Sequence, residues 1–408
     1  MHIIYLHQYF VPPEGMGGTR SLEMARRIVR AGHKVTLITS DAYFPKEDYH
    51  LNEKVNYLTI EGVNVIVIKN PYSNSMSFTQ RICSFLKFAF FATTVALKTE
   101  KVDVVFATST PLTIAIPGII SKKILRCPMV FEVRDLWPEI PIALGFLKNP
   151  INKFLARALE KISYANSSHI VALSPGMKEG IIKQGYPPVQ ITVIPNSSDV
   201  ELFSVKNEIG ASFLELHPFL KGKALLSYAG TIGYVNGLEY LVEIASCLKK
   251  LDPEIKIAIV GEGKEKDNII KKARDKKVLG KNLFILPALR KKDIPALLNA
   301  STICSSFVIN KKVLWNNSAN KFFDALAAGR PILINYLGWQ ADIIEKYKCG
   351  LVVPPDDPIK AAELILNYVL SYNNIREAGE NAQKVARTIY DRNVLAEKLI
   401  RVLVDNSK

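Results

Sequence analysis

Residues 316–331, Asn-Asn-Ser-Ala-Asn-Lys-Phe-Phe-Asp-Ala-Leu-Ala-Ala-Gly-Arg-Pro, join polar side chains, a helix start and a helix stop. Asn317 or Ser318 is the expected N-cap, and Gly329, just ahead of a proline, is the expected end. Four apolar residues recur at helical spacing and are expected in a core: Phe322, Phe323, Leu326 and Ala327.

The start of this predicted helix suits an anion. A helix N-terminus presents unpaired N–H groups and the positive end of the helix dipole, and Lys321 adds a full charge in the first turn. Asp324, one turn on, is placed to accept hydrogen bonds from ligand hydroxyls. A ligand with phosphates at one end and a ribose nearby fits both residues, although a capped amphipathic helix without a ligand explains the pattern as well.

Length and charge limit the classes of function. The 408 residues are 48% hydrophobic and 22% charged, which favours two or three globular domains. The net charge of +15 points to a negatively charged partner: nucleic acid, an anionic membrane surface or a phosphorylated metabolite. Nucleic acid is not expected, since no basic stripe with interleaved aromatic residues occurs.

Cysteine and histidine usage argues against bound metal. The five cysteines contain no Cys-x-x-Cys pair and the six histidines are scattered. The first residues have a strand pattern rather than a signal-peptide pattern. We therefore expect a reducing cytoplasmic setting with no disulfide or zinc framework, no metal and no cofactor.

Alternating strand and helix patterns predict an α/β chain with two parallel sheets covered by helices. In the first half, strands are expected at 2–6, 35–39, 63–68, 102–108, 129–133 and 170–173. In the second half, strands are expected at 225–229, 256–260, 283–286, 303–307, 332–334 and 351–353. We predict Rossmann-like doubly wound domains over 1–197 and 198–385, with a helix over 386–408 that packs on the first domain.

Residues 78–101 combine phenylalanines with lysines and one arginine. The apolar part is shorter than the roughly 20 residues that a membrane-spanning helix needs. An interfacial helix on anionic lipid and a buried helix of the first domain both remain open.

Glycine-rich loops follow several predicted strands, where open α/β sheets bind ligands. Gly17 and Gly18 precede a helix in the first half, and residues 230–237 link a strand to a helix in the second. Gly261 and Gly263 flank Glu262 after the next strand. None of these loops has Rossmann dinucleotide spacing, so dinucleotide binding is disfavoured.

A diphosphate would have to be neutralised without an obvious metal site, because the chain contains no Asp-x-Asp triplet. Lys321, helix N-termini and a second basic residue such as Arg290 are the candidates. Arg290 follows a predicted strand and precedes a helix. It is equally explained as one more solvated charge beside two lysines.

Three charged residues end the predicted strand at 129–133. Glu132, Arg134 and Asp135 are expected to bind an acceptor, and Asp135 is a candidate to accept its proton. A structural cluster of salt bridges is the alternative.

Six pieces of the chain, in this order, carry a resemblance to a known family. They are Tyr9-Phe10-Val11-Pro12-Pro13-Glu14 with Gly17-Gly18, Gly32-His33-Lys34-Val35, Asp135-Leu136-Trp137-Pro138-Glu139, Ile194-Pro195-Asn196, Val260-Gly261-Glu262-Gly263, and Asp324-Ala325-Leu326-Ala327-Ala328-Gly329-Arg330-Pro331. They resemble the GT-B glycosyltransferases, specifically the retaining glycosyltransferase family 4. The third piece is similar to a motif of a bacterial subgroup that builds surface polysaccharide. The resemblance implies a GT-B fold, with two Rossmann-like domains, a cleft between them and a C-terminal helix that returns to the first domain.

The chain departs from this family at four positions. Two glutamates eight positions apart are usual, and Asn316 and Asp324 occupy those places here. The usual Arg and Lys of the glycine loop are replaced by Thr231 and Asn236. We predict that Lys321 restores the missing charge. The residues expected to bind the donor are Gly17, Gly18, Thr231, Glu262, Arg290, Asn316, Asn320, Lys321 and Asp324, and the expected catalytic residues are Asp135 and Lys321.

The resemblance implies a metal-independent hexosyl- or N-acetylhexosaminyltransferase. Its donor would be a nucleotide-sugar, with UDP favoured, and its acceptor a lipid-linked saccharide in O-antigen or capsule synthesis. The enzyme would act in the cytoplasm, peripherally on the inner face of the cell membrane. A GT-B-fold sugar-nucleotide 2-epimerase and a non-catalytic nucleotide-sugar binding protein are the alternatives.

Overall fold

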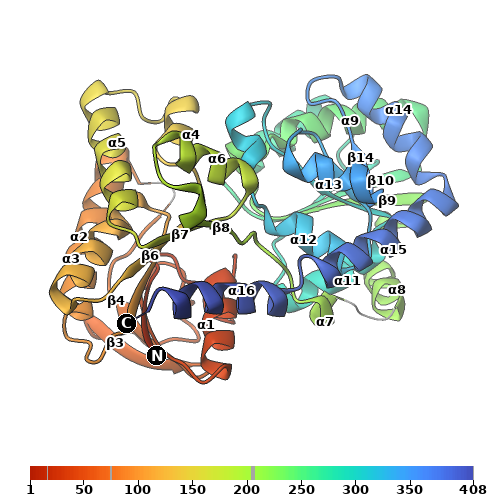
Figure 1. Cartoon of the computed structure of the whole chain (residues 1–408). Helices are drawn as coiled ribbons and strands as arrows, with labels where there is room; N and C mark the ends of the chain where they lie inside the picture. Colours follow the sequence, from red (N-terminus) through yellow and green to blue (C-terminus); the bar gives the residue numbers. More distant parts are fainter. Residues whose placement is uncertain (16, 74–75, 204–206, 408) are drawn as a thin grey trace. The chain divides into compact units, whose positions relative to one another are not determined.

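The structure is a computed structural model that describes residues 1–15, 17–73, 76–203 and 207–407 (Figure 1). It divides into two compact units. The first unit comprises Met1–Pro195 together with Asn393–Lys408, and the second comprises Asn196–Arg392. Both are α/β units built on mostly parallel sheets, as the alternating pattern predicts.

The first unit holds an eight-stranded sheet in the order β3-β4-β2-β1-β5-β6-β7-β8. Its strands are β1 (His2–Leu6), β2 (Lys34–Ser40), β3 (Val55–Ile60), β4 (Val63–Ile68), β5 (Val104–Thr108), β6 (Met129–Val133), β7 (His169–Ala172) and β8 (Ile191–Val193). Only β3 runs antiparallel, and it pairs with β4 across a turn at Glu61 and Gly62, both at positive φ. Such a two-residue turn matches the twist of a hairpin. Both β3 and β8 are absent from the strands predicted above.

Helices cover both faces of this sheet. They are α1 (Arg20–Arg30), α2 (Phe78–Ala96), α3 (Ala115–Leu125), α4 (Glu139–Ala143), α5 (Pro150–Ala165), α6 (Pro175–Lys183) and α16 (Arg392–Asp405). Ile4 and Leu6 pack with residues of α2, α3, α5 and α6. Ile3 and Tyr5 point to the other face, where α1 and α16 pack. Side chains of β1 are therefore buried on both faces, as in parallel sheets generally.

The C-terminal helix belongs to the first unit, as expected from the resemblance. Leu395, Leu399 and Leu403 of α16 are buried in the same cluster as Leu22 and Ile28 of α1 (dark blue and red in Figure 1). The structure places the two divisions at 195/196 and 392/393, against the expected 197/198 and 385/386.

The second unit holds a six-stranded, all-parallel sheet in the order β11-β10-β9-β12-β13-β14. Its strands are β9 (Ala224–Ala229), β10 (Ile255–Val260), β11 (Leu283–Leu286), β12 (Ile303–Ser306), β13 (Ile332–Ile334) and β14 (Gly350–Val352). Its helices are α7 (Val200–Phe203), α8 (Asn207–Leu216), α9 (Leu238–Leu251), α10 (Lys266–Asp275), α11 (Ile294–Ala300), α12 (Asn320–Ala327), α13 (Trp339–Tyr347), α14 (Pro358–Val369) and α15 (Tyr372–Thr388).

Helix α2 uses one face to cover the first sheet. Phe85 and Phe88 are buried, whereas Leu86 and Phe90 on the same helix are exposed. Among the described residues, no helix has the length and apolar character needed to cross a membrane.

Candidate active site

Helix α12 opens at Asn320, and its N-cap is Ala319, without a side-chain hydrogen bond. The expected capping by Asn317 or Ser318 is therefore wrong. Asn317 Oδ1 accepts a hydrogen bond from Ala319 N at 3.1 Å, and Ser318 Oγ accepts one from Asn196 N at 2.9 Å. Both side chains therefore form hydrogen bonds with groups that lie before the helix in the chain and do not cap the first turn of the helix. The four predicted core residues of α12 are buried as expected: Phe322, Phe323, Leu326 and Ala327.

Lys321 reaches the glycine loop at the end of β9. Its Nζ lies 5.0 Å from the centroid of the Tyr228 ring, and a Cβ placed on Gly230 would be 3.1 Å from the same nitrogen. The Tyr228 hydroxyl in turn donates to the Thr231 carbonyl at 2.7 Å. The lysine therefore lies beside the loop whose usual Arg and Lys are replaced here, so its ammonium can supply charge there.

The two glycine motifs of the second unit contact each other through their backbones. Ile232 N donates to Glu262 O at 2.8 Å. A Cβ on Gly261 would lie 1.9 Å from Gly230 O, and one on Gly263 would lie 2.2 Å from Ile232 O. Any side chain at either position would push the loops apart, so glycine is required by this close approach. The side chain of Asn236 donates to Thr231 O at 2.9 Å, which fixes the loop further.

Lys321 and Asp324 are two charged groups whose neighbours do not hydrogen-bond to them or pair with them as ions, although the Lys321 ammonium lies over the Tyr228 ring. Within the described part of the chain, neither Lys321 Nζ nor the Asp324 carboxylate forms a hydrogen bond or ion pair. Burial lowers the pKa of Lys321 to about 8, although nearby Asp324 acts to raise it. Burial raises the pKa of Asp324 to about 6, although Lys291, Arg392 and Lys321 act to lower it. Such desolvated, unsatisfied charges are typical of ligand-binding sites.

Arg290 was predicted as the second basic residue for the diphosphate, and Lys291 is one of the two lysines that follow it. In the structure, Arg290 is 66% exposed in its side chain and its Nε lies 3.2 Å from Asp293 Oδ2. Lys291 is the residue close enough to Asp324 to lower its pKa. Lys291 begins a 3₁₀ turn after β11. The sequence showed that it follows a strand, but not which way its side chain points.

The other predicted donor residues lie at loop ends of the second unit. Asn316 ends a 3₁₀ helix before α12, and Asn320 is the first residue of α12. Thr231 is exposed in the glycine loop. Glu262 is exposed, and its carboxylate pairs with Lys266 Nζ at 2.6 Å.

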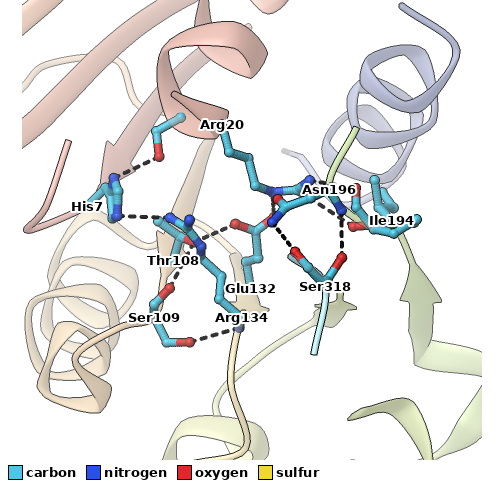
Figure 2. Close-up of polar contacts among 11 residues, drawn as sticks. His7, Arg20, Thr108, Ser109, Glu132, Arg134, Ile194, Asn196 and Ser318 are labelled. Carbon is cyan, nitrogen blue, oxygen red and sulfur yellow. Dashed lines mark hydrogen bonds and ion pairs between the residues drawn. The ribbon is translucent and has the colours of Figure 1, made fainter. Parts of the chain in front are cut away.

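In the first unit, Glu132 at the end of β6 is fully buried and pairs with Arg20 (Figure 2). Arg20 Nη2 and Nε donate to Glu132 Oε1 at 2.7 and 3.1 Å, and Thr108 Oγ1 donates to Oε2 at 2.5 Å. Arg20 also donates to the carbonyls of Pro195 and Ile194. Burial raises the pKa of Glu132, but Arg20, Arg134 and Thr108 together outweigh burial and bring the pKa below the ordinary value. Glu132 has no exposed surface and its carboxylate is taken up by Arg20 and Thr108, so its surroundings fit the alternative of a structural cluster and leave no room for the expected acceptor contact.

Arg134 and Asp135 lie next to this cluster and are half-buried. Arg134 Nη1 lies 3.1 Å from His7 Nε2, and Arg134 N donates to Ser109 Oγ at 3.0 Å (Figure 2). Among the described residues, no group donates to the Asp135 carboxylate, and burial raises its pKa to about 6, against the opposing effect of Arg134. The half-buried Asp135 carboxylate therefore keeps its oxygens available to a ligand, unlike that of Glu132.

His7 was missed by sequence reasoning, although it directly follows β1. Burial and the Arg134 charge hold its pKa well below the ordinary value, so the imidazole is neutral. Because Arg134 donates to Nε2, the proton resides on Nδ1, which lies 2.7 Å from Ser21 Oγ. His7 therefore orients Arg134.

Gly17 and Gly18 directly precede Thr19, the N-cap of α1, and Gly17 is exposed. Gly17 has a φ of +149°, and a Cβ there would lie 3.2 Å from Val11 Cγ2. Met16, between them and Gly15, lies outside the described residues.

The two units match two family models. Residues 16–197 match the glycosyl transferase 4-like domain, and residues 215–385 match glycosyl transferases group 1. The chain belongs to the GT-B glycosyltransferases. The expected GT-B fold is confirmed, and the site described above is therefore the candidate active site of a glycosyltransferase.

Two curated relatives and one solved structure are similar to this glycosyltransferase. The putative colanic acid biosynthesis glycosyl transferase WcaI of Escherichia coli is 26% identical over 299 residues, covering 70% of this chain and 72% of WcaI. The UDP-Gal:α-D-GlcNAc-diphosphoundecaprenol α-1,3-galactosyltransferase of E. coli is 24% identical, covering 64% and 65%. HepE of Anabaena, solved with UDP and glucose, matches with a TM-score of 0.73 at 17% identity, covering 99% of this chain and 100% of HepE.

Proposed function

We propose that this glycosyltransferase moves a sugar from a UDP-sugar to a lipid-linked saccharide in bacterial surface-polysaccharide synthesis, with retention of configuration and without a metal ion. One observation carries the donor assignment: the unpaired Lys321 ammonium lies against Gly230, at the loop where the family's cationic side chains are replaced. The E. coli relative that uses UDP-Gal and a diphosphoundecaprenol-linked acceptor supports the substrate classes. The name of WcaI supports the setting in polysaccharide synthesis.

In the proposed reaction, the bond between the sugar C1 and the diphosphate oxygen breaks while the acceptor hydroxyl bonds to C1 on the same face. The acceptor proton passes to the departing diphosphate. Lys321, with the N–H groups of α12 and the glycine loop, stabilises the charge that develops on that diphosphate. Asp324 accepts hydrogen bonds from the ribose hydroxyls, and Asn316 takes the place of a carboxylate near the donor sugar.

Arg134 and Asp135 are proposed to hold the acceptor, and Asp135 to pass the acceptor proton on to the departing diphosphate. The Asp135 carboxylate has a pKa of about 6, so it is mostly ionised at neutral pH and able to accept a proton. The enzyme is proposed to act in the cytoplasm on the inner face of the cell membrane, where a lipid-linked acceptor would lie.

The test is a screen of UDP-, GDP- and dTDP-sugars for thermal stabilisation, followed by release of free nucleoside diphosphate with and without a membrane extract as acceptor. We expect stabilisation by a UDP-sugar, and UDP release that needs the acceptor and is insensitive to EDTA. Loss of turnover in EDTA would reject the metal-free mechanism. A changed sugar with UDP still attached would indicate an epimerase, and binding without turnover would indicate a binding protein.

A further inference from the structure

Helix α5 of the first unit and the loop before it carry a patch of exposed apolar side chains, defined here as the α5 face: Phe146 of the loop and Ile151, Phe154, Leu155 and Ile162 of the helix. Five of the 23 large hydrophobic side chains found exposed among the described residues fall in these 17 positions. Ile151 is 68% exposed and Phe154 71%. Single exposed apolar residues are ordinary on protein surfaces, but such a concentration marks an interaction site.

Helix α5 carries apolar side chains on its outward side as well as on the side that faces the core. Its inward side buries Glu160, Ser163 and Tyr164, and the Tyr164 hydroxyl donates to Glu160 Oε1 at 3.0 Å. Ile151, Leu155 and Ile162 recur at helical spacing and point outward. Leu159 and Tyr164 of this helix do pack against the core, but core packing does not explain the outward positions of Ile151, Leu155 and Ile162.

The charges around the α5 face are nearly all positive. Lys148, Lys153, Arg157 and Lys161 lie in the same segment, and the only acidic residue from 144 to 174 is the buried Glu160. Arg157 is offset by Glu139, whose Oε1 lies 3.1 Å from its Nε. Three lysines thus remain beside the apolar side chains without an ion pair within the described part of the chain.

We infer that the α5 face docks onto an anionic lipid bilayer, with α5 lying in the plane of the interface. A helix of 16 residues is about 24 Å long, which suits a position along the surface. Apolar side chains enter the acyl boundary while lysines meet anionic headgroups. A second copy of this chain is disfavoured as the occupant, because two such faces would bring like charges together.

This inference assigns the membrane contact to α5 instead of α2, the helix within the predicted interfacial segment 78–101. Of the large apolar side chains that the structure describes on α2, Leu86 and Phe90 are exposed, while Phe85 and Phe88 belong to the core. The inference shares with the proposed function only the expectation of a lipid-linked acceptor. Its test needs no nucleotide.

The experiment is co-sedimentation of the full chain with vesicles of phosphatidylcholine, with or without phosphatidylglycerol. We expect binding to the anionic vesicles that weakens with salt, and a loss of about tenfold or more in Phe154→Ser/Leu155→Ser. Leu86→Ser/Phe90→Ser on α2 is the matched control and should bind like the wild type. Both variants replace exposed side chains, and circular dichroism with thermal melting checks that each folds.

Two double variants that reverse lysine charges complete the experiment. Lys148→Glu/Lys161→Glu should abolish the preference for anionic vesicles, whereas Lys271→Glu/Lys281→Glu, at exposed positions of the second unit, should keep it. Equal losses in the α5 and α2 variants, or unchanged binding in the α5 variant, would overturn the inference. A wild-type dimer that Phe154→Ser/Leu155→Ser converts to a monomer would make the α5 face a protein interface instead.

Nucleotide binding separates this inference from the proposed function. Stabilisation by a UDP-sugar should be the same in the wild type and in the α5 variants without vesicles. If the wild type binds vesicles through α5 but no nucleotide-sugar, the proposed function fails while the docking surface stands.

Discussion

Each unit places a pair of opposite charges near the carboxyl ends of its strands, and the two pairs differ in one respect. Arg20 and Glu132 in the first unit bond to each other, to Thr108 and to backbone carbonyls. Lys321 and Asp324 in the second unit are also desolvated, yet the described structure gives neither of them a hydrogen bond or an ion pair. Burial therefore raises the pKa of Asp324, whereas the pKa of Glu132 is lowered despite burial.

The contrast separates charges that support the fold from charges that await a ligand. A buried ion pair with all its hydrogen bonds made is costly to break and has no capacity left for substrate. A buried charge without a partner costs stability in the free protein, and that cost is offset when a ligand of opposite charge arrives. Substitutions in the two pairs should accordingly have opposite effects on stability and binding.

Glu132→Ala should show the largest effect. Removing the carboxylate leaves Arg20 buried without its anion, so the free energy of unfolding should fall by about 3 kcal/mol or more. Urea denaturation measures this change. Glu262→Ala, which removes an exposed ion pair with Lys266, is the control and should cost less than about 1 kcal/mol. If both variants lost a similar amount of free energy of unfolding, Glu132 would contribute no more to stability than an exposed charge does.

Lys321→Met should have the opposite pattern of effects, with weaker donor binding and no loss of stability. Removing the ammonium that faces the diphosphate should weaken binding of a UDP-sugar by about 100-fold, as expected for a charge-assisted contact in a desolvated site. The melting temperature should not fall and should rise slightly, because a half-buried charge without a hydrogen bond or ion pair is lost. Lys292→Met, an exposed neighbour of Lys291, should leave both quantities unchanged. A destabilised Lys321→Met with normal affinity would assign Lys321 to the fold.

The pH dependence of UDP-sugar binding should show two limbs. Binding needs Asp324 ionised and Lys321 protonated, so affinity should fall below pH 6 and again above pH 8, each by about tenfold per pH unit beyond the limb. A UDP-sugar is the right probe because UDP alone has a phosphate that titrates near pH 6. Asp324→Asn should remove the acidic limb and Lys321→Met the alkaline limb, as isothermal titration calorimetry would show. Limbs that persist in these variants belong to other groups.

Much of this architecture could be predicted from the sequence, because the spacing of apolar residues and the glycines and prolines that end helices and strands are local features. Apolar runs marked β1, β6, β10 and β11, and the α12 core residues were placed correctly. The hairpin strand β3 was missed because its turn depends on backbone angles at Glu61 that residue types do not announce.

Side-chain direction was the other limit. Charge and position marked both Glu132 and Lys321 as candidates, but only the fold shows that Arg20, 112 residues away, saturates the carboxylate. The same holds for His7. The scattered positions of the histidines gave no sign of a functional role, but in the structure His7 lies against Arg134. Contacts between residues far apart in the sequence cannot be recognised from a short stretch of it, whereas the spacing of apolar residues can.

The smallest expected difference separates two adjacent residues, Arg290 and Lys291. Lys291 acts on Asp324, whereas Arg290 is largely exposed and pairs with Asp293. Lys291→Met should therefore weaken UDP-sugar binding several-fold and raise the pKa of Asp324, moving the acidic limb to higher pH. Arg290→Met should change affinity less than twofold, since a solvated ion pair contributes little. Calorimetry of both variants across pH 5 to 9 makes the comparison. An effect confined to Arg290 would restore it as the second basic residue on the diphosphate, and would mean that Asp324 is not coupled to Lys291 when donor is bound.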